Sequence, residues 1–155
     1  MVRSFDIGVV RLAERFLKHD PPTSKEVEAV RTVVRASTAE VQSLLRLPGI
    51  TCVGTAGTIT TLAAMVQHLD RFEHARIHNY RLTLNDIVQL ERELVSKTQA
   101  ERRGMPALES GREEVIVSGV IILSTVMSSL GRCECLVSNF GLREGVLLNA
   151  AACSR

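Results

Sequence analysis

With 155 residues, of which 45% are hydrophobic and 23% charged, the chain has the length and composition of one soluble globular domain with a sizeable core. A formal net charge of +2 is too small to indicate a polyanionic partner by itself. An aromatic fraction of 3%, without Trp, argues against a nucleic-acid surface built on base stacking and predicts an aliphatic core.

The cysteines and the N-terminus favour a cytoplasmic protein. Four cysteines without any sign of secretion are expected to be reduced thiols. The first residues lack the apolar region of a signal peptide. The most apolar stretch, residues 115–130, is interrupted by Ser and Thr and is shorter than the ~20 residues that a membrane-spanning helix needs. We therefore expect no membrane segment.

Apolar periodicity predicts the elements of the first half of the chain. Residues 4–8 are expected to end a strand, and a first helix follows over 9–18 until Asp20-Pro21-Pro22 stops it. Thr23 and Glu26 match a capping box, which predicts the start of a second helix that continues to just before Pro48.

The middle and end of the chain follow the same alternation. A strand over 50–53 leads through a glycine–threonine turn into a helix that ends near Leu69. The next elements are a short strand near Ile77, a helix capped by Thr83, a loop or short helix over 96–106, the strongest helix over 115–130, a strand over 135–138 and a helix over 141–151.

Two of these helices carry predictions about packing. The helix over 115–130 is apolar on two sides, so we expect it to lie centrally between a sheet and other helices, with Gly131 ending it. Leu142, Val146 and Leu147 of the last helix are expected to face inward.

The order of strands and helices predicts an α/β fold in a single domain over residues 1–155. Few strands are available for so many helices, so the sheet should be small. We find no internal repeat, low-complexity segment or linker.

The glycine–threonine turn is the main candidate for a binding site. Gly54, Thr55, Ala56, Gly57 and Thr58 lie between a strand and the start of a helix, where N–H groups without intrahelical partners and the helix dipole favour an anion. No Lys follows the last glycine, so the turn is not a Walker loop. The alternative is an ordinary strand-to-helix connection capped by Thr.

Four separated blocks, in order along the chain, carry a family resemblance. Residues 53–64 resemble the signature of the exopolyphosphatase/guanosine pentaphosphate phosphohydrolase (Ppx/GppA) family, and residues 4–14, 111–119 and 137–147 are similar to further segments of it. The resemblance implies part of a ribonuclease H-like domain of the sugar kinase–actin–chaperone superfamily, helix-rich with a small mixed sheet.

The resemblance also implies an activity and a cofactor. Members of the family hydrolyse the terminal phosphoanhydride of polyphosphate, or release the 5′ phosphate of guanosine pentaphosphate, with a divalent metal such as magnesium. The chemistry needs donors around the phosphates and a carboxylate that orients or deprotonates the attacking water. The residues do not separate the two substrates.

The chain departs from the family pattern before Ser4. The Asp-containing first phosphate loop, the catalytic glutamate and the second glycine-rich loop of the family have no match there. We therefore expect the chain to correspond to the C-terminal part of the two-domain catalytic region, to hold neither catalytic residues nor metal ligands, and to be inactive alone. The expected partner is the N-terminal half of the family fold, with a second copy of the chain as an alternative.

The residues that match the family blocks give the candidate site. The turn Gly54–Thr58 is expected to bind phosphate or nucleotide, and Arg112, Gly119, Asn139, Arg143 and Glu144 are candidates for the same cleft. Close packing of its helix against the sheet is the favoured role of Gly119, and a surface or helix-start role is as well supported for Arg143. Glu144 suits the dipole of the last helix better than catalysis. Asn139 and Glu114 stand where the family commonly has Asp.

Other reactive side chains are assigned structural roles. Cys133 and Cys135 form a single C-x-C pair, and His68, His74 and His78 lie in an irregular segment, so no metal site is expected. Arg11 and Glu14 are predicted to be an ion pair or a pair of surface residues.

Two functions from other classes stay open. The first is a non-catalytic module that binds a phosphate chain or a guanosine nucleotide. The second is an interaction domain that recruits another chain through an exposed sheet edge.

Overall fold

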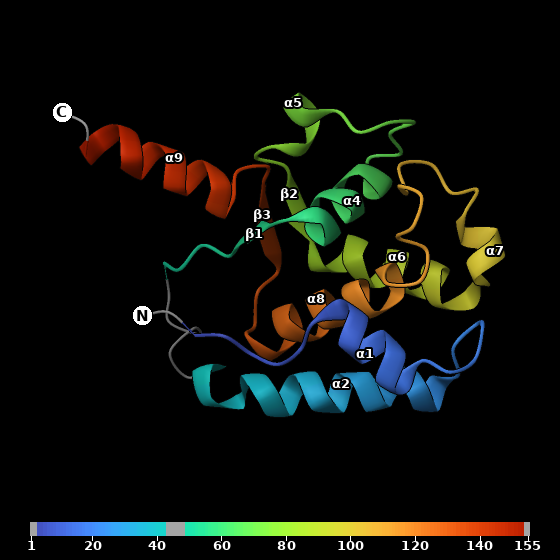
Figure 1. The fold of residues 1–155 in the computed structure, drawn as a ribbon. Helices are drawn as coiled ribbons and strands as arrows, with labels where there is room; N and C mark the ends of the chain where they lie inside the picture. The colour runs from blue at the N-terminus through green and yellow to red at the C-terminus, as the bar shows by residue number, and fades with distance from the viewer. Residues whose placement is uncertain (1–2, 43–48, 154–155) are drawn as a thin grey trace.

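The computed structural model describes residues 3–42 and 49–153 as a helix-rich α/β fold (Figure 1). The predicted end of the long second helix falls partly on residues 43–48 and lies outside this description. No helix among the described residues has the length and apolarity needed to cross a membrane.

The sheet is small and mixed, as the α/β pattern and the resemblance predicted. It consists of β1 (Val53–Thr55), β2 (Arg81–Thr83) and β3 (Glu134–Ser138) in the order β1-β3-β2. β1 runs parallel to β3, with Thr55 opposite Ser138, and β2 runs antiparallel to β3. The central strand is therefore the last one in the sequence.

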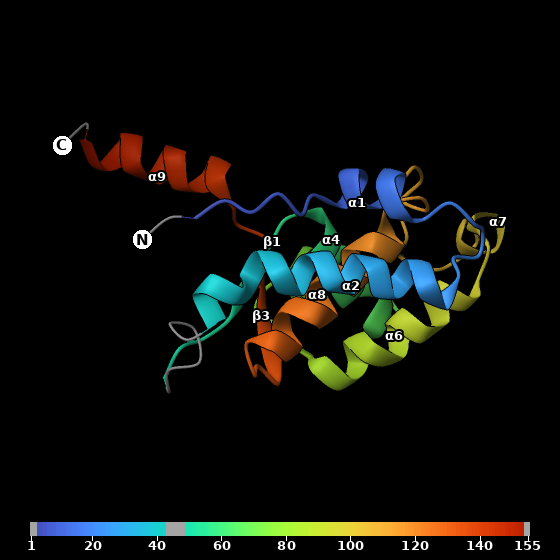
Figure 2. The same ribbon diagram turned by 90° about the horizontal axis from the view of Figure 1, so that it is seen from below.

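Helix α8 (Ile116–Ser129) forms the centre of the fold, as its two apolar sides predicted. It packs most extensively against α2 (Ser24–Thr38) and α6 (Leu84–Ser96), and also contacts α1 (Val9–Phe16) and α4 (Gly57–Val66) (Figures 1 and 2). The expected sheet on one side of it is replaced by α4, which itself contacts β1 and β3. The second apolar side thus meets a helix that lies against the sheet.

The predicted helix boundaries follow from local capping. Thr23 and Glu26 form the capping box of α2, and Thr83 accepts a hydrogen bond from the Asp86 N–H at the start of α6. The loop or short helix expected over 96–106 contains the short helix α7 (Gln99–Arg102), which has its own Thr98–Glu101 capping box. Gly131 has a φ of 64° just after α8, a conformation that suits Gly at a helix end.

A buried polar group joins three helices. Glu91 of α6 is 5% exposed and pairs with Arg31 of α2, while the Ser124 hydroxyl of α8 donates to its second oxygen. A buried carboxylate without partners would be costly, so these bonds fix how α2, α6 and α8 meet.

Residues 39–41 continue α2 as the 3-10 turn η1 (Ala39–Val41).

The strand predictions are only partly right. Residues 4–8 form no strand and enter α1 as irregular chain, and the first strand begins at Val53 instead of Ile50. Ile77 belongs to a short helix, α5 (His74–Ile77), and β2 was not predicted. β2 has three residues, of which only Leu82 is buried, so it is too short to produce an alternating pattern.

The prediction that α9 (Leu142–Cys153) packs inward is wrong. Leu142, Val146 and Leu147 are 85%, 58% and 70% exposed, and the helix projects away from the other elements (Figures 1 and 2). None of the described elements packs extensively against it. The apolar pattern was read correctly, but the surface that would cover it does not come from the described residues.

Candidate functional site

The two parallel strands bring two helix starts to one edge of the sheet. β1 leads through Thr55 and Ala56 into α4, and β3 leads through residues 139–141 into α9. The two connections are close, because a Cβ added to Gly141 would lie 3.8 Å from the Thr55 Oγ1. Ligands of open α/β sheets bind at such carboxyl ends of parallel strands.

The start of α4 is open to an anion. Its N-cap is Ala56, and no side chain caps the first N–H groups of the helix. Thr60 turns its hydroxyl to the carbonyl oxygens of Ala56 and Gly57, away from those N–H groups. The positive end of the helix dipole therefore meets the exposed turn without a side-chain acceptor.

Ala56 holds an unusual conformation at this turn. Its φ is 74° and its ψ is 173°, a region that residues other than Gly rarely adopt. The fold maintains this geometry between β1 and α4 at a cost of roughly 1–3 kcal/mol. Such strain is commonly found at ligand-binding turns.

Arg112 contacts the turn directly. A Cβ added to Gly57 would lie 2.3 Å from one guanidinium nitrogen of Arg112, so Gly57 makes room for this cation at the start of α4. Arg112 also donates through Nε to Glu109 at 2.6 Å. The structure thus brings Arg112, predicted from a separate sequence block, to the turn.

The other turn residues have packing roles. Gly54 is buried, and a Cβ there would lie 2.1 Å from Ile59 Cδ1 and 3.0 Å from Cys135 Sγ. A Cβ on Gly119 would lie 2.6 Å from the Thr58 methyl group, so Gly119 allows α8 to approach α4. The packing role predicted for Gly119 agrees with this contact, although the partner is a helix and not the sheet.

Glu144 occupies the start of α9. Its Oε2 accepts a hydrogen bond from the Gly141 N–H at 2.7 Å, and this backbone bond lowers the pKa of its carboxyl group. The carboxylate therefore already meets the positive end of this helix, so α4 is the better anion-binding end. Arg143 is exposed on α9.

Asn139 joins β3 to the segment of α5. Its Nδ2 donates to the His74 carbonyl oxygen at 2.9 Å, and its backbone N–H donates to His78 Nδ1 at 3.3 Å. Its Oδ1 is buried and has no hydrogen-bond partner within the described chain. No local sequence pattern indicates this contact with His74 and His78, since the residues are more than sixty positions apart.

No group of three or more His, Cys, Asp or Glu side chains among the described residues is arranged to hold a metal ion. Arg11 pairs with Asp6, which lies in the irregular segment just before α1, in place of the predicted Glu14.

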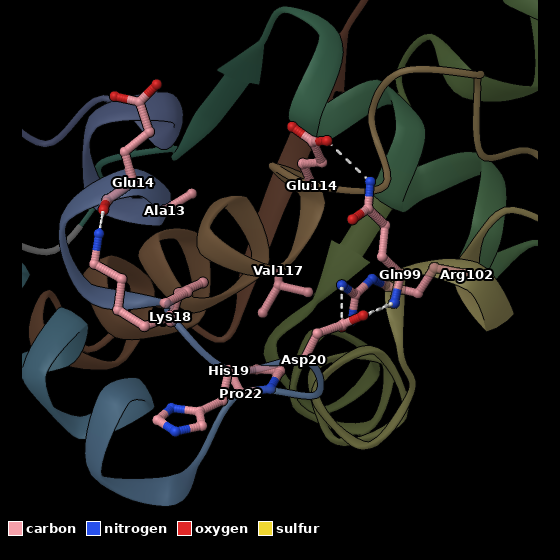
Figure 3. A pocket seen from close by; sticks show the side chains of 11 residues that line it. Ala13, Glu14, Lys18, His19, Asp20, Pro22, Gln99, Arg102, Glu114 and Val117 are labelled. Atoms are coloured by element: carbon pink, nitrogen blue, oxygen red, sulfur yellow. Dashed lines mark hydrogen bonds and ion pairs between the residues drawn. The ribbon is translucent and has the colours of Figure 1, made fainter.

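A second hollow, of about 250 Å³, lies between the end of α1 and α7 (Figure 3). Its polar groups bind one another: Arg102 donates to Asp20, and the Gln99 side chain donates to Glu114. Arg102 also donates to the carbonyl oxygens of Leu94 and Glu113. We assign this hollow a structural role, since the Arg102 guanidinium is bonded to Asp20 and to the carbonyl oxygens of Leu94 and Glu113.

A helix-rich α/β domain with a small mixed sheet, and a tight turn at the shared carboxyl edge of its parallel strands, is one half of the actin-like architecture seen in solved phosphatases. The chain belongs to the Ppx/GppA phosphatase family, whose sequence model matches residues 1–152.

The chain is similar to named proteins and to proteins of solved structure. It is 34% identical over 156 residues to Exopolyphosphatase 2 of Mycobacterium tuberculosis, covering 96% of this chain and 48% of that protein. The Ppx/GppA family member of Aquifex aeolicus superposes with a TM-score of 0.90 at 31% identity, over 100% of this chain and 50% of that one. An exopolyphosphatase from Cytophaga hutchinsonii gives 0.81 at 26% identity, over 96% and 48%. The chain therefore spans about half the length of the relatives it matches.

Proposed function

We propose that this chain forms one wall of the cleft of an exopolyphosphatase-type hydrolase, which releases orthophosphate from the end of polyphosphate or of guanosine pentaphosphate. The observation that carries the proposal is the open start of α4, with Arg112 against Gly57. Backbone N–H groups and a guanidinium group are the donors that bind phosphate oxygens. Membership of the phosphatase family supports the same ligand class.

The role assigned to the turn is binding, and not proton transfer. Glu144 is bonded to the Gly141 N–H, and Glu109 is paired with Arg112. A general base needs a carboxylate that can reach the attacking water, so neither side chain suits that role in this arrangement. The carboxylate of the reaction belongs, in this proposal, to the part of the family fold outside the matched half.

Magnesium does not fit the residues at the turn. Mg²⁺ is usually bound through one or two carboxylates together with substrate phosphates and water, and Gly54–Thr58 carry no carboxylate. We therefore assign no metal ligand to residues 54–58.

The exposed α9 suggests the partner. Phe140, Leu142, Leu147 and Leu148 are at least 60% exposed on α9 and the connection before it. The matched relatives are about twice as long as the matched segment. We propose that this apolar surface packs against the other half of the family fold, because exposed apolar area of this kind marks an interface. A concentration-dependent dimer in sedimentation would favour a second copy of the chain as the occupant.

Calorimetric titration with polyphosphate and with guanosine pentaphosphate tests the binding role. We expect heat for one of the two ligands, and a Kd that rises about tenfold or more in Arg112→Ala, since a charge-assisted bond contributes about 1.5–3 kcal/mol. Arg35→Ala is the matched control, because Arg35 is exposed on α2 and its side chain pairs with Glu28 of the same helix. Equal loss in both variants, or no heat with either ligand, would contradict the proposal.

Orthophosphate release in the presence of magnesium tests whether this chain binds the substrate without catalysing its hydrolysis. The chain alone is expected to show no turnover of polyphosphate, because its turn binds without a catalytic carboxylate. Sustained turnover by the purified chain would show that the reaction needs nothing beyond these residues.

A further inference from the structure

Cys52 and Cys135 lie opposite each other on neighbouring strands. β1 and β3 pair in parallel with Val53 opposite Leu136, so the preceding residues, Cys52 and Cys135, face each other. The ladder extends to them, since the Leu136 N–H donates to the Cys52 carbonyl oxygen at 2.8 Å. Neighbouring strands are about 4.8 Å apart, which falls within the Cα separation of about 4.4–6.8 Å that disulfides span.

The two thiols also interact chemically. Hydrogen bonding from the Cys135 thiol to the ionised Cys52 sulfur is the main cause that lowers the pKa of Cys52 to about 7; burial opposes the shift and the charge of Arg132 adds to it. The same bond, burial and the negative charge on Cys52 raise the pKa of Cys135. The Cys135 Sγ also lies 3.9 Å from the Leu136 carbonyl oxygen. The directions of the two shifts make Cys52 the thiol of the pair that ionises more readily.

The two sulfurs differ in access. Cys52 is partly exposed and lines a hollow of about 220 Å³ beside Arg132 and Cys133, whereas Cys135 is fully buried. A small oxidant can therefore reach Cys52, and the neighbouring Cys135 is placed to react with the product. A reactive thiolate next to a second thiol is the usual arrangement of a redox-sensitive site.

We propose that Cys52 and Cys135 are a peroxide-reactive pair that closes to a disulfide between β1 and β3. The Cys52 thiolate attacks hydrogen peroxide, the O–O bond breaks, and the distal oxygen leaves as hydroxide and is protonated to water. The Cys135 sulfur then attacks the resulting sulfenic acid, the S–S bond forms and a second water leaves. In total, two thiols are oxidised to one disulfide and one peroxide is reduced to two waters.

The second step becomes easier once the first has occurred. The sulfenic acid is neutral, so the negative charge that helps to raise the pKa of Cys135 is removed. The hydrogen bond that Cys135 donated to the thiolate is lost at the same time. Both changes favour ionisation of Cys135 at the moment when it must act as the nucleophile.

The disulfide would form directly behind the glycine–threonine turn. Cys135 Sγ lies 3.0 Å from the Cβ position of Gly54, two residues before Ala56. The proposal nevertheless does not depend on what the turn binds, because the chemistry involves only the two thiols and the oxidant.

Intact mass and peptide mapping after peroxide treatment test the proposal. In the double variant Cys133→Ser/Cys153→Ser, we expect the mass to fall by two hydrogen atoms, a linked peptide that contains Cys52 and Cys135, and reversal by dithiothreitol. Addition of oxygen atoms without a link would overturn the proposal. In the unmodified chain, a link from Cys52 to Cys133 in place of Cys135 would do the same.

The pH dependence of alkylation gives an independent readout. Iodoacetamide is expected to modify Cys52 with a midpoint near pH 7, against about 8.5 for an ordinary thiol, since reactivity appears as pH rises through the pKa. Cys135→Ala should shift this midpoint upward by removing the hydrogen-bond donor, whereas Cys133→Ser, the matched control, should leave it unchanged. If Cys135→Ala does not fold, the midpoint and the mapped link in the unmodified chain decide; an ordinary midpoint contradicts the assignment.

Discussion

At the scale of single residues, the turn between β1 and α4 combines features that stability alone does not favour. Ala56 adopts a positive φ, and the first N–H groups of α4 receive no side-chain cap. An Asp, Asn, Ser or Thr N-cap contributes about 1 kcal/mol at most helix starts. The absence of such a side chain leaves the helix end accessible, as an anion site requires.

Replacement of Ala56 by Gly should stabilise the chain. Relief of strain, roughly 1–3 kcal/mol, exceeds the roughly 0.4–1 kcal/mol by which Gly favours the unfolded chain, so we expect a net gain of about 1 kcal/mol in urea unfolding. Ala36→Gly is the control with opposite sign, because Ala36 is exposed within α2. Gly at this helix position should lower the free energy of unfolding by about 1 kcal/mol through its poor helix propensity. A loss in both variants would show that Ala56 is unstrained.

Glu26 makes the stability of the fold depend on pH in the acid range. Burial raises the pKa of its carboxyl group, but hydrogen bonds from His19, Thr23 and Lys18 outweigh this and lower it to about 2. Because the folded pKa lies below the ordinary value of 4.5, the stabilisation is complete above that value and is lost as pH falls toward 2.

Glu26→Gln tests this sign. The variant should melt at a lower temperature than the parent near neutral pH, and the difference should shrink between about pH 5 and about pH 2 as the parent carboxylate becomes protonated. A difference that stays constant over this range would show that packing, and not ionisation, is responsible. Glu28→Gln, an exposed carboxylate on the same helix, is the matched control.

At the scale of elements, the close approach of α8 to α4 depends on Gly119. A Cβ at this position meets the Thr58 methyl group at 2.6 Å, below any ordinary contact distance. Gly within a helix otherwise costs about 1 kcal/mol relative to Ala, so contact between the two helices explains its presence in α8.

Gly119→Ala should therefore destabilise the chain even though Ala is the better helix former. We expect a net loss of about 1–2 kcal/mol in urea unfolding, from overpacking of about 1–3 kcal/mol reduced by the propensity gain. Gly145→Ala is the matched control, since a Cβ there meets nothing within 4 Å inside α9, and it should gain up to about 1 kcal/mol. A gain in both variants would mean that Thr58 moves aside freely.

At the scale of the whole molecule, the apolar side chains form two groups. One group makes up the core between several helices, and the other lies exposed on α9. The core side chains of α2, α4, α6 and α8 are almost completely buried, whereas those of α9 are exposed. An apolar helix surface of this kind is stabilised by a partner and not by the domain that carries it.

Leu147→Ser should leave the free energy of unfolding of the chain within about 0.5 kcal/mol of the parent value, because the side chain is exposed. The same change at Leu62, which is fully buried in α4, should cost several kcal/mol. A large loss from Leu147→Ser, measured at low protein concentration, would place α9 against the chain's own core.

The sequence predicted most of what depends on local pattern. Capping by Thr23 and Thr83, the apolar stripes of α8 and the turn before α4 are set by residues within a few positions of one another, and all of these elements formed. β2 and the true start of β1 were not predicted, because strands of three residues carry too little alternation.

By itself, the sequence determined the α/β class, the family blocks and the helix-start geometry of the turn, since each rests on residue type and short spacing. Only the tertiary structure decided that Arg112 lies against Gly57 and that Cys52 faces Cys135. It also reversed the expected burial of α9. These contacts join positions far apart in the chain, and their geometry follows from strand register and helix packing, which short-range periodicity does not encode.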